Sequence, residues 1–347
     1  MSGTYTRIKR DEIKQLIESE YGINIINMHE GDKGILLYTD CGTKMLKKVK
    51  RDDAKLQFAA SAYQYLYDRG FRNMSRINKT KSEGSSFEYN NSRYIVQDYV
   101  RGNVIEIRTP EAAAKVAEAL ALLHKAGENY VPPQGGHARV DWGKWMDKFK
   151  ANSINIKKYD KGLQDKKILT KFDRLYERCT QEYYEKMFNA YLILRNFGYL
   201  EKVQQSMKQN QLIHSEYRRH SLLLDDQGEV FVLNLENCAY DIREADIATM
   251  LESFTGRNKA ELAGAALKAY SNIIKLDRRS IKVIQALILQ PKHFYKVIER
   301  YYGRKKNFTE AELCNKLERA IKKEARKGPI LEVLEEKTTR VCKRGRG

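Results

Sequence analysis

The chain has 347 residues, of which 42% are hydrophobic and 31% charged, which is typical of a globular protein and argues against a disordered one. No apolar run approaches the roughly 20 residues of a membrane span, and residues 1–7 lack the apolar centre of a signal peptide. We therefore expect an intracellular protein with no membrane partner, large enough for two lobes or domains.

The formal net charge of +19 calls for a hypothesis about the partner. Nucleic acid, an acidic protein layer and an acidic polymer would each match it, and so would a solvated basic surface without a specific ligand. Lysine and arginine are spread along the chain, apart from the basic run 340–347, and no aromatic-plus-basic motif accompanies them. Specific nucleic-acid binding is therefore not expected.

The five cysteines form no Cys-x-x-Cys pair, which indicates reduced, structural thiols. They are Cys41, Cys179, Cys238, Cys314 and Cys342. Because neither His214 with His220 nor the nearby Cys238 has a recognised zinc spacing, we expect no zinc site there.

Residues 1–100 predict a β-rich N-terminal lobe. Apolar runs bounded by turn residues predict strands at 23–28, 34–39, 44–49, 86–90 and 93–100. Apolar periodicity predicts helices at 7–22 and 53–69. The lobe is expected to end in a Gly-containing hinge at 101–103.

Residues 101–330 predict a larger helical lobe. Thr109 and Pro110 are typical of a helix start, and Gly127 ends that helix. Further helical segments are predicted at 145–208, 243–254, 258–275, 278–302 and 308–326. A short helix and a loose basic tail are expected after 327, the tail covering 331–347. His124 is expected to be packed rather than a ligand.

The chain is organised around residues 211–252. Two short apolar strands there are separated by the turn Asp225-Asp226-Gln227-Gly228 and have polar residues at both ends. Phosphoryl transfer needs such an arrangement, with a base on one loop and metal ligands on the next. The alternative is a hairpin that merely has polar ends.

The segment resembles the catalytic segment of the aminoglycoside-phosphotransferase and choline-kinase branch of the protein-kinase-like fold. That branch has His-Gly-Asp, an Asn five residues after the Asp, a turn, and Ile-Asp-hydrophobic-Asp/Glu. His214, Glu236 and Asp246 match the pattern. The resemblance implies an α+β, bilobal fold, with a small, mainly antiparallel N-lobe and a larger helical C-lobe. It implies a scaffold role for Asp246.

Other positions depart from the pattern. Ser215 replaces the Gly, and Glu216 stands at the position of the catalytic Asp. Ser221 and Asn234 stand where the branch has its metal-binding Asn and Asp. With Glu236, these two are the metal positions that the resemblance implies.

The resemblance also assigns a nucleotide site in the N-lobe. Lys47 is the candidate for the strand lysine that holds the phosphates of ATP, and backbone groups near Gln97 to Tyr99 would face an adenine. The weak glycine pattern of 30–34 would cover the phosphates. The predicted helix 53–69 contains no Glu to pair with Lys47.

These departures argue against catalysis. Mg²⁺ with a triphosphate prefers hard anionic oxygens, whereas Asn234 offers a neutral amide and Ser221 a hydroxyl. Glu216 keeps the acid, but its extra methylene moves the oxygens by about an ångström, which can cost on the order of 10²-fold in rate.

A narrower resemblance covers residues 10–325. It rests on the order of four stretches, 122–127, 130–135, 142–145 and 287–302. Their order is similar to that of the CotS-type spore coat proteins of endospore-forming bacteria. This family implies a location in the spore coat, on the mother-cell side of the developing spore, and other coat proteins as partners.

Two interpretations remain open from the sequence. In the first, the chain is a catalytically degenerate pseudokinase that acts in coat structure or assembly. In the second, it is an active small-molecule phosphotransferase with ATP and Mg²⁺ as cofactors, Glu216 as the base, Glu236 as the main metal ligand and Lys47 on the phosphates.

Overall fold

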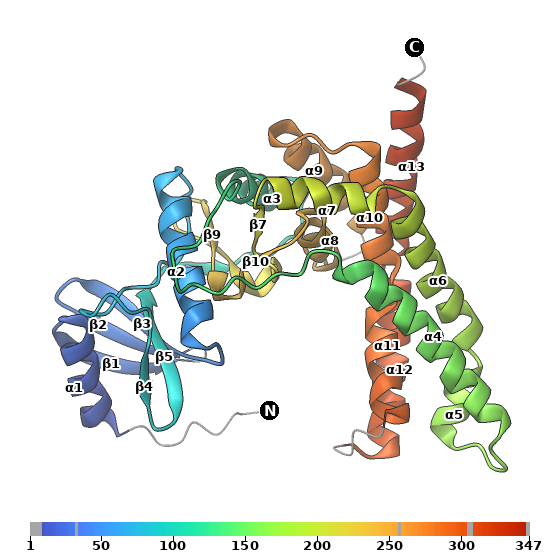
Figure 1. The fold of residues 1–347 in the computed structure, drawn as a ribbon, viewed down its shortest axis with the longest axis horizontal. Helices are drawn as coiled ribbons and strands as arrows, with labels where there is room; N and C mark the ends of the chain where they lie inside the picture. The colour runs from blue at the N-terminus through green and yellow to red at the C-terminus, as the bar shows by residue number, and fades with distance from the viewer. Residues whose placement is uncertain (1–8, 32–33, 256–257, 304–307, 345–347) are drawn as a thin grey trace.

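The computed structural model describes residues 9–31, 34–255, 258–303 and 308–344. It has two lobes in an open arch, with a β-sheet at one end and long helices at the other (Figure 1). The predicted bilobal α+β fold is confirmed. The start of the predicted helix 7–22, the middle of the loop 30–34 and the last tail residues lie outside the described residues.

The N-terminal lobe is built on an antiparallel sheet with the strand order β1-β2-β3-β5-β4. Its strands are β1 (Ile25–Gly31), β2 (Gly34–Thr39), β3 (Gly42–Val49), β4 (Phe87–Tyr89) and β5 (Ser92–Asp98). Neighbouring residues of β5 point to opposite faces, because side chains alternate along a strand. Val96 packs with Ile13 and Ile17 of α1 (Arg10–Tyr21), whereas Ile95 joins the main core.

Helix α2 (Asp53–Asp68) connects this sheet to the rest of the molecule. Asp52 caps it by accepting a hydrogen bond from the Lys55 backbone N–H. Its buried apolar side chains belong to the main core of the helical lobe. The hydroxyl of Tyr63, fully buried, accepts a hydrogen bond from the backbone N–H of Leu235 across 3.2 Å.

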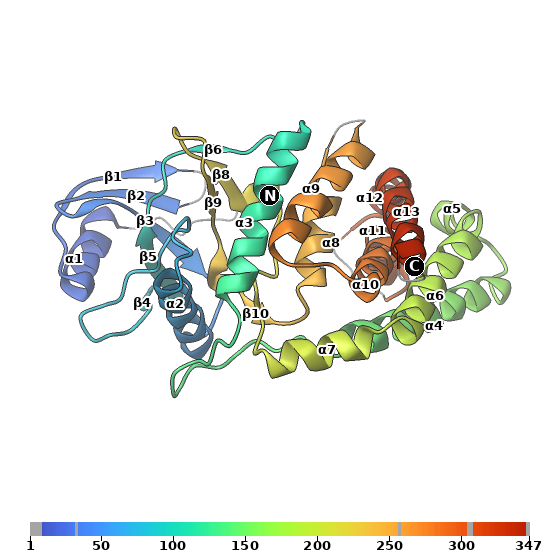
Figure 2. The same cartoon turned by 90° about the horizontal axis from the view of Figure 1, so that it is seen from above.

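The helical lobe surrounds three short strand pairings (Figure 2). The strands and 3-10 turns are β6 (Asn103–Val104), β7 (Leu212–Ile213), η1 (Arg219–Ser221), β8 (Leu222–Leu224), β9 (Val230–Val232), η2 (Leu235–Asn237) and β10 (Ala239–Tyr240). The helices up to them are α3 (Pro110–Ala126), α4 (Lys144–Gln164), α5 (Lys171–Glu177), α6 (Thr180–Asn196) and α7 (Tyr199–Lys208). The helices after them are α8 (Glu244–Glu252), α9 (Lys259–Ile273), α10 (Arg278–Leu289), α11 (Lys292–Tyr302), α12 (Glu310–Ala325) and α13 (Gly328–Arg344).

Two predictions about the C-terminal helices were wrong. The helix predicted over 278–302 is two helices, because Pro291 cannot continue the helix and its predecessor Gln290 is extended, with φ −51° and ψ 122°. The segment expected to be a short helix and a loose tail is helical through Arg344. None of the helices in the described residues is long and apolar enough to cross a membrane.

Helix α4 is attached to the central strands through a buried carboxylate. Asp241 follows β10 and accepts hydrogen bonds from Trp145 Nε1 and from the Ile242 backbone N–H, both at 2.8 Å. Trp142 stacks on Tyr240 at 5.0 Å between ring centroids. Burial raises the pKa of Asp241 to about 8.

We predict that Asp241 makes the wild-type protein less stable as pH rises, relative to Asp241→Asn. Because the folded pKa lies above the unfolded value of about 3.9, the native state binds more protons between the two values. The difference in unfolding free energy should therefore fall by about 1.4 kcal/mol per pH unit. Urea unfolding of both proteins at pH 5, 6 and 7 measures it, and a constant difference would contradict the prediction.

Candidate active site

The loop that contains the predicted catalytic positions is fixed by Asp246. Its carboxylate is fully buried in the first turn of α8. Oδ2 accepts the backbone N–H of His214 at 2.6 Å, and Oδ1 accepts that of Ser215 at 2.8 Å. These bonds hold the backbone of the loop, which is the kind of contact expected of a scaffold residue.

Two further side chains orient Asp246. Nε2 of His124 lies 3.2 Å from Oδ2, and Nδ1 lies 2.8 Å from the hydroxyl of Tyr270. Burial lowers the pKa of His124 although the Asp246 carboxylate opposes the shift, so the ring is a neutral donor to Asp246 and an acceptor from Tyr270. The prediction that His124 is packed is confirmed.

His214 connects the loop to the residue that follows β9. Its Nδ1 accepts the backbone N–H of Glu216 at 3.1 Å, which places the proton on Nε2 for donation to the carbonyl of Leu233 at 2.7 Å. Both ring nitrogens are thus engaged. Ser215 has φ +70°, a left-handed conformation that costs a non-glycine residue about 1–2 kcal/mol. Ser215 therefore keeps a backbone conformation that favours the glycine of the kinase pattern.

Glu216 lies in a network that the sequence did not reveal. Its Oε2 accepts a hydrogen bond from Nδ2 of Asn237 at 3.3 Å, and Oδ1 of Asn237 accepts one from Arg51 at 2.7 Å. Ser221 Oγ donates to the Glu216 carbonyl at 3.1 Å. The only sequence signal for Asn237 was its place directly after Glu236, and no pattern pointed to Arg51.

Lys47 reaches across from β3 to the predicted metal positions. Its ammonium donates to Asn234 Oδ1 at 2.6 Å and forms an ion pair with Glu236 Oε1. Asn234 in turn donates through Nδ2 to Ser221 Oγ at 3.3 Å. The structure therefore brings all four of these predicted residues together at the junction of the lobes.

The backbone at Asn234 explains why an amide is tolerated there. Asn234 has φ +64°, in the left-handed region that Asn enters more readily than other side chains. The turn η2 follows at once and buries Glu236, whose side chain is 6% exposed. Glu236 Oε2 is buried and has no hydrogen-bond partner in the part of the chain that the structure describes.

This donor set fits a magnesium ion poorly. The amide oxygen of Asn234 is engaged by Lys47, and the hydroxyl of Ser221 donates to a carbonyl. Glu236 is then the single carboxylate, whereas Mg²⁺ prefers several hard oxygens in octahedral array. Within the ranges that the structure describes, no group of three or more His, Cys, Asp or Glu side chains could hold a metal ion.

Backbone groups of the hinge that was predicted to face an adenine form hydrogen bonds within the protein. Gln97 is buried and pairs with Met45 in the sheet. The Tyr99 N–H donates to the carbonyl of Thr43 at 3.2 Å, and the carbonyl of Asp98 accepts the Ser75 hydroxyl at 2.7 Å. These two hinge groups would have to exchange partners before they could bind a base.

Residues 14–334 match the family described as "Spore coat putative kinase YutH". This match spans most of the chain. The chain belongs to this spore coat kinase family. Spore coat protein S of Bacillus subtilis (strain 168) is 22% identical over 309 residues, which are 86% of this chain and 85% of that protein.

Solved structures establish the aminoglycoside-phosphotransferase-like fold of this spore coat family member. An aminoglycoside phosphotransferase from Alicyclobacillus acidocaldarius superposes with a TM-score of 0.79 at 16% identity, covering 94% of this chain and 96% of that one. A spectinomycin phosphotransferase in complex with AMP gives 0.62 at 11% identity, covering 89% and 94%. The predicted kinase-like fold and spore coat family are therefore both confirmed.

We predict that Lys47→Met destabilises the protein by about 3 kcal/mol, because it leaves the buried Glu236 carboxylate without its cation. The double variant K47M/E236Q should recover more than half of that loss. Lys44→Met is the matched control on the same strand, since its partner Asp98 is a third exposed, and it should cost about 1 kcal/mol or less. Urea unfolding of the four proteins tests this. Equal losses at Lys44 and Lys47 would contradict the importance of the buried pair.

Proposed function

We propose that this spore coat family member is a catalytically degenerate pseudokinase that acts in coat structure or assembly, on the mother-cell side of the developing spore. The proposal rests chiefly on Lys47, whose ammonium contacts Asn234 and Glu236. This internal cation already neutralises the single carboxylate among the metal positions. The engaged hinge groups support the same conclusion.

One observation favours the alternative, an active phosphotransferase that uses ATP and Mg²⁺. Glu236 Oε2 is buried and has no hydrogen-bond partner among the described residues, so it could accept a cation. The two proposals differ in whether Mg²⁺ promotes nucleotide binding by the unmodified protein.

We predict that ATP with Mg²⁺ does not raise the thermal midpoint of the wild-type protein above its value with ATP alone. The double variant S221N/N234D restores the amide and carboxylate of the kinase branch, and should gain a Mg²⁺-dependent rise. At a hundredfold excess over Kd, binding stabilises a folded protein by about 2.7 kcal/mol. Scanning calorimetry with and without Mg²⁺ measures the effect.

The control is Gln227→Glu, which adds the same charge on the exposed β8–β9 turn. A Mg²⁺-dependent rise in the wild-type protein that is lost in Glu236→Gln would overturn the pseudokinase proposal and support the enzyme. No rise in the restored variant would mean that the cleft has lost more than these two ligands.

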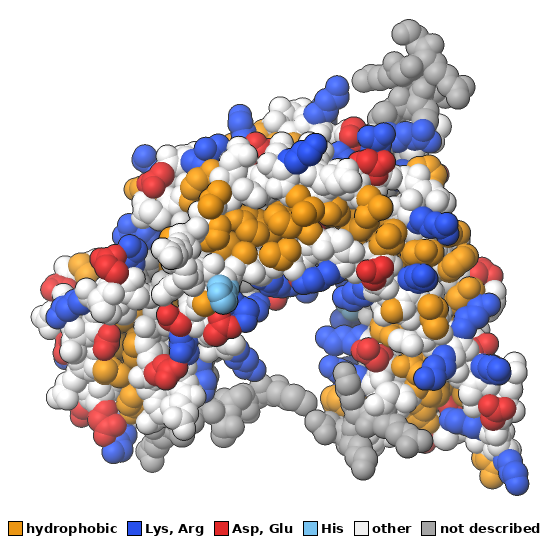
Figure 3. Space-filling view, viewed as in Figure 1, with side chains coloured by type: hydrophobic (Ala, Val, Ile, Leu, Met, Phe, Trp, Pro, Cys, Tyr) orange, Lys and Arg blue, Asp and Glu red, His pale blue; other side chains and the backbone are white. Residues whose placement is uncertain are grey.

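An exposed apolar band supports a role in a protein layer. Figure 3 shows hydrophobic side chains gathered along α7 and the segment that leads into α4. Val131, Leu200 and Met207 are 67%, 50% and 49% exposed. Exposed apolar side chains that gather on one face often mark protein–protein contacts, which is consistent with other coat proteins as partners.

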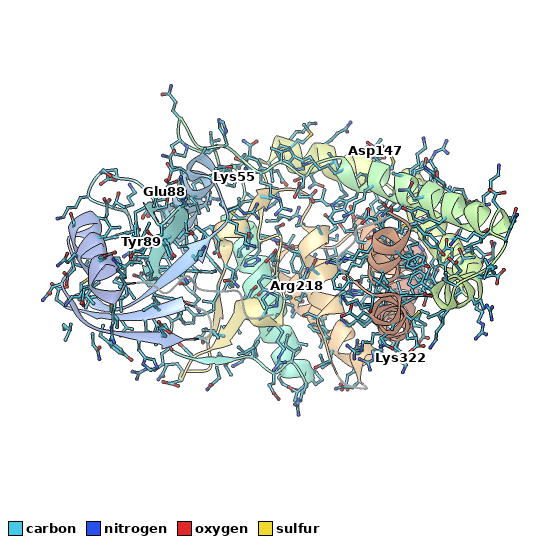
Figure 4. The ribbon with its side chains drawn as sticks, turned by 90° about the horizontal axis from the view of Figure 1, so that it is seen from below. Lys55, Glu88, Tyr89, Asp147, Arg218 and Lys322 are labelled. Atoms are coloured by element: carbon cyan, nitrogen blue, oxygen red, sulfur yellow. The ribbon has the colours of Figure 1, made fainter. Side chains whose placement is uncertain are left out.

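A basic wall supports an acidic polypeptide as one such partner. We give this name to Arg218, Lys292, Lys323, Arg326 and Lys327. Figure 3 shows Lys and Arg side chains gathered where the molecule is hollowed between the sheet and α11–α12, and Figure 4 shows Arg218 near the centre of that side. Burial, with the charges of Lys327, Lys292 and Lys323, lowers the pKa of His293 to about 4.

The inner part of the basic wall is held by ion pairs. Glu252 pairs with Lys292 and, at 3.1 Å, with Lys327, which also pairs with Glu324 at 2.6 Å. These contacts fix two cations, while Arg218, Lys323 and Arg326 remain exposed. The wall therefore offers exposed positive charge next to the loop that contains Glu216.

We predict that the variant R218Q/K323Q/R326Q binds a fluorescent peptide of twelve glutamates about tenfold more weakly than the wild-type protein. Three exposed charge contacts of about 0.2–1 kcal/mol each account for that factor. The control K158Q/K161Q/K167Q removes three exposed lysines from α4 and the segment after it. Fluorescence anisotropy at fixed salt is the measurement. Equal weakening in both triple variants would show that only net charge matters.

A further inference from the structure

A cavity of about 670 Å³ lies apart from the candidate active site. It is formed by residues 69–73 after α2, by one side of α3 and by residues 228–230 at the start of β9. These elements lie side by side when the molecule is viewed from above (Figure 2). The volume is within the range of about 300–1,000 Å³ that is usual for small-molecule sites.

Four cations line this cavity: Arg69, Arg72, Lys115 and Lys125. None of them forms an ion pair within the described residues. The two guanidinium groups lie over the rings of Tyr65 and Tyr67, at 5.3 and 5.2 Å from the ring centroids. Glu118 and Glu229 are the two acidic residues of the lining, so its formal charge is positive.

The α3 side of the cavity has a distinct order of charge. Lys115, Leu122 and Lys125 lie on one face of the helix, because residues three, four and seven apart share a face. The two lysines are separated by about 15 Å along the axis. Glu118, Ala119 and Leu122 lie between them; Leu122 is 49% exposed, Ala119 is buried and Glu118 is exposed. This face of α3 therefore has a lysine at each end, and one exposed apolar side chain beside one carboxylate in the middle.

We infer that this cavity binds a small organic anion that carries two or more carboxylate or phosphate groups on an apolar body. The guanidinium forks and the lysines match such groups, and the apolar body would cover Leu122. The cavity volume of about 670 Å³ is that of a small-molecule site.

The wall of the cavity is connected to the junction of the lobes. Val232 exchanges backbone hydrogen bonds with this segment, donating to Asn73 at 2.9 Å and accepting from Ser75 at 3.3 Å. Ser75 also donates its hydroxyl to Asp98 at the hinge. Because β9 leads directly to Asn234, a ligand in the cavity would stabilise both the hinge and the metal-position strand.

The experiment titrates the full chain with decanedioate, whose two carboxylates are joined by an apolar chain, and measures binding by calorimetry. Decanoate, with one carboxylate, and 1,10-decanediol, with none, should bind at least tenfold more weakly. The variant R69Q/R72Q/K125Q should weaken decanedioate binding by about tenfold or more, and K158Q/K161Q/K167Q by less than twofold. Phosphate-bearing probes of the same length show which anionic group is preferred.

Hydrogen exchange gives a second, local readout. Decanedioate should slow exchange of the amides of Ser75 and Val232 in the wild-type protein, and Glu236→Gln should leave this effect intact, so the result does not depend on the proposed function. Equal binding by both triple variants, or binding of decanoate as tight as that of decanedioate, would overturn the assignment. Slower hydrogen exchange spread evenly over the basic surface would also overturn the assignment.

Discussion

The arrangement of the candidate site depends on one buried carboxylate. Asp246 receives two backbone N–H groups of the loop after β7 and is itself oriented by His124, which is held by Tyr270. A buried carboxylate is tolerated only when hydrogen bonds satisfy it. The fold therefore retains the support of a kinase catalytic loop even where the residues supported, Ser215 and Glu216, have changed.

The second constraint is the contact that Lys47 makes with two of the predicted metal positions. In the kinase-like fold, the strand lysine and the metal ligands serve the same phosphates from two lobes. Here Lys47 contacts Asn234 and Glu236 directly. An amide in place of a carboxylate lowers the negative charge at this point, so one ammonium is enough to neutralise it. The same substitutions that disfavour Mg²⁺ therefore favour a stable closed contact.

Much of the fold could be predicted from the sequence because its signals are local. Thr109 and Pro110 placed the start of α3, and the turn 225–228 placed the β8–β9 hairpin. The resemblance to the kinase branch also implied that Ser221, Asn234 and Glu236 share one site. Pro291, by contrast, was overlooked as a helix break within a continuous apolar pattern, although its chemistry forbids a continuous helix.

Other parts of the site could not be predicted, because they depend on contacts between residues far apart in the chain. Arg51 forms a hydrogen bond with Asn237, which lies 186 residues later in the chain, and no spacing rule links the two residues. The cavity lined by Arg69 and Lys125 needs the docking of α2 against α3, which only the folded chain reveals. A sequence pattern shows the periodicity of a single helix or strand. These sites depend instead on how separate helices and strands pack against one another.

The bond between Lys47 and Glu236 also has a mechanical consequence. Kinase-like enzymes work by letting their lobes swing about a hinge to admit and release nucleotide. In this chain, such a motion of the lobes requires that the Lys47 ammonium first separate from the buried Glu236 carboxylate. Breaking this contact leaves a buried carboxylate without its cation, which is costly, so the ion pair favours one fixed orientation of the two lobes.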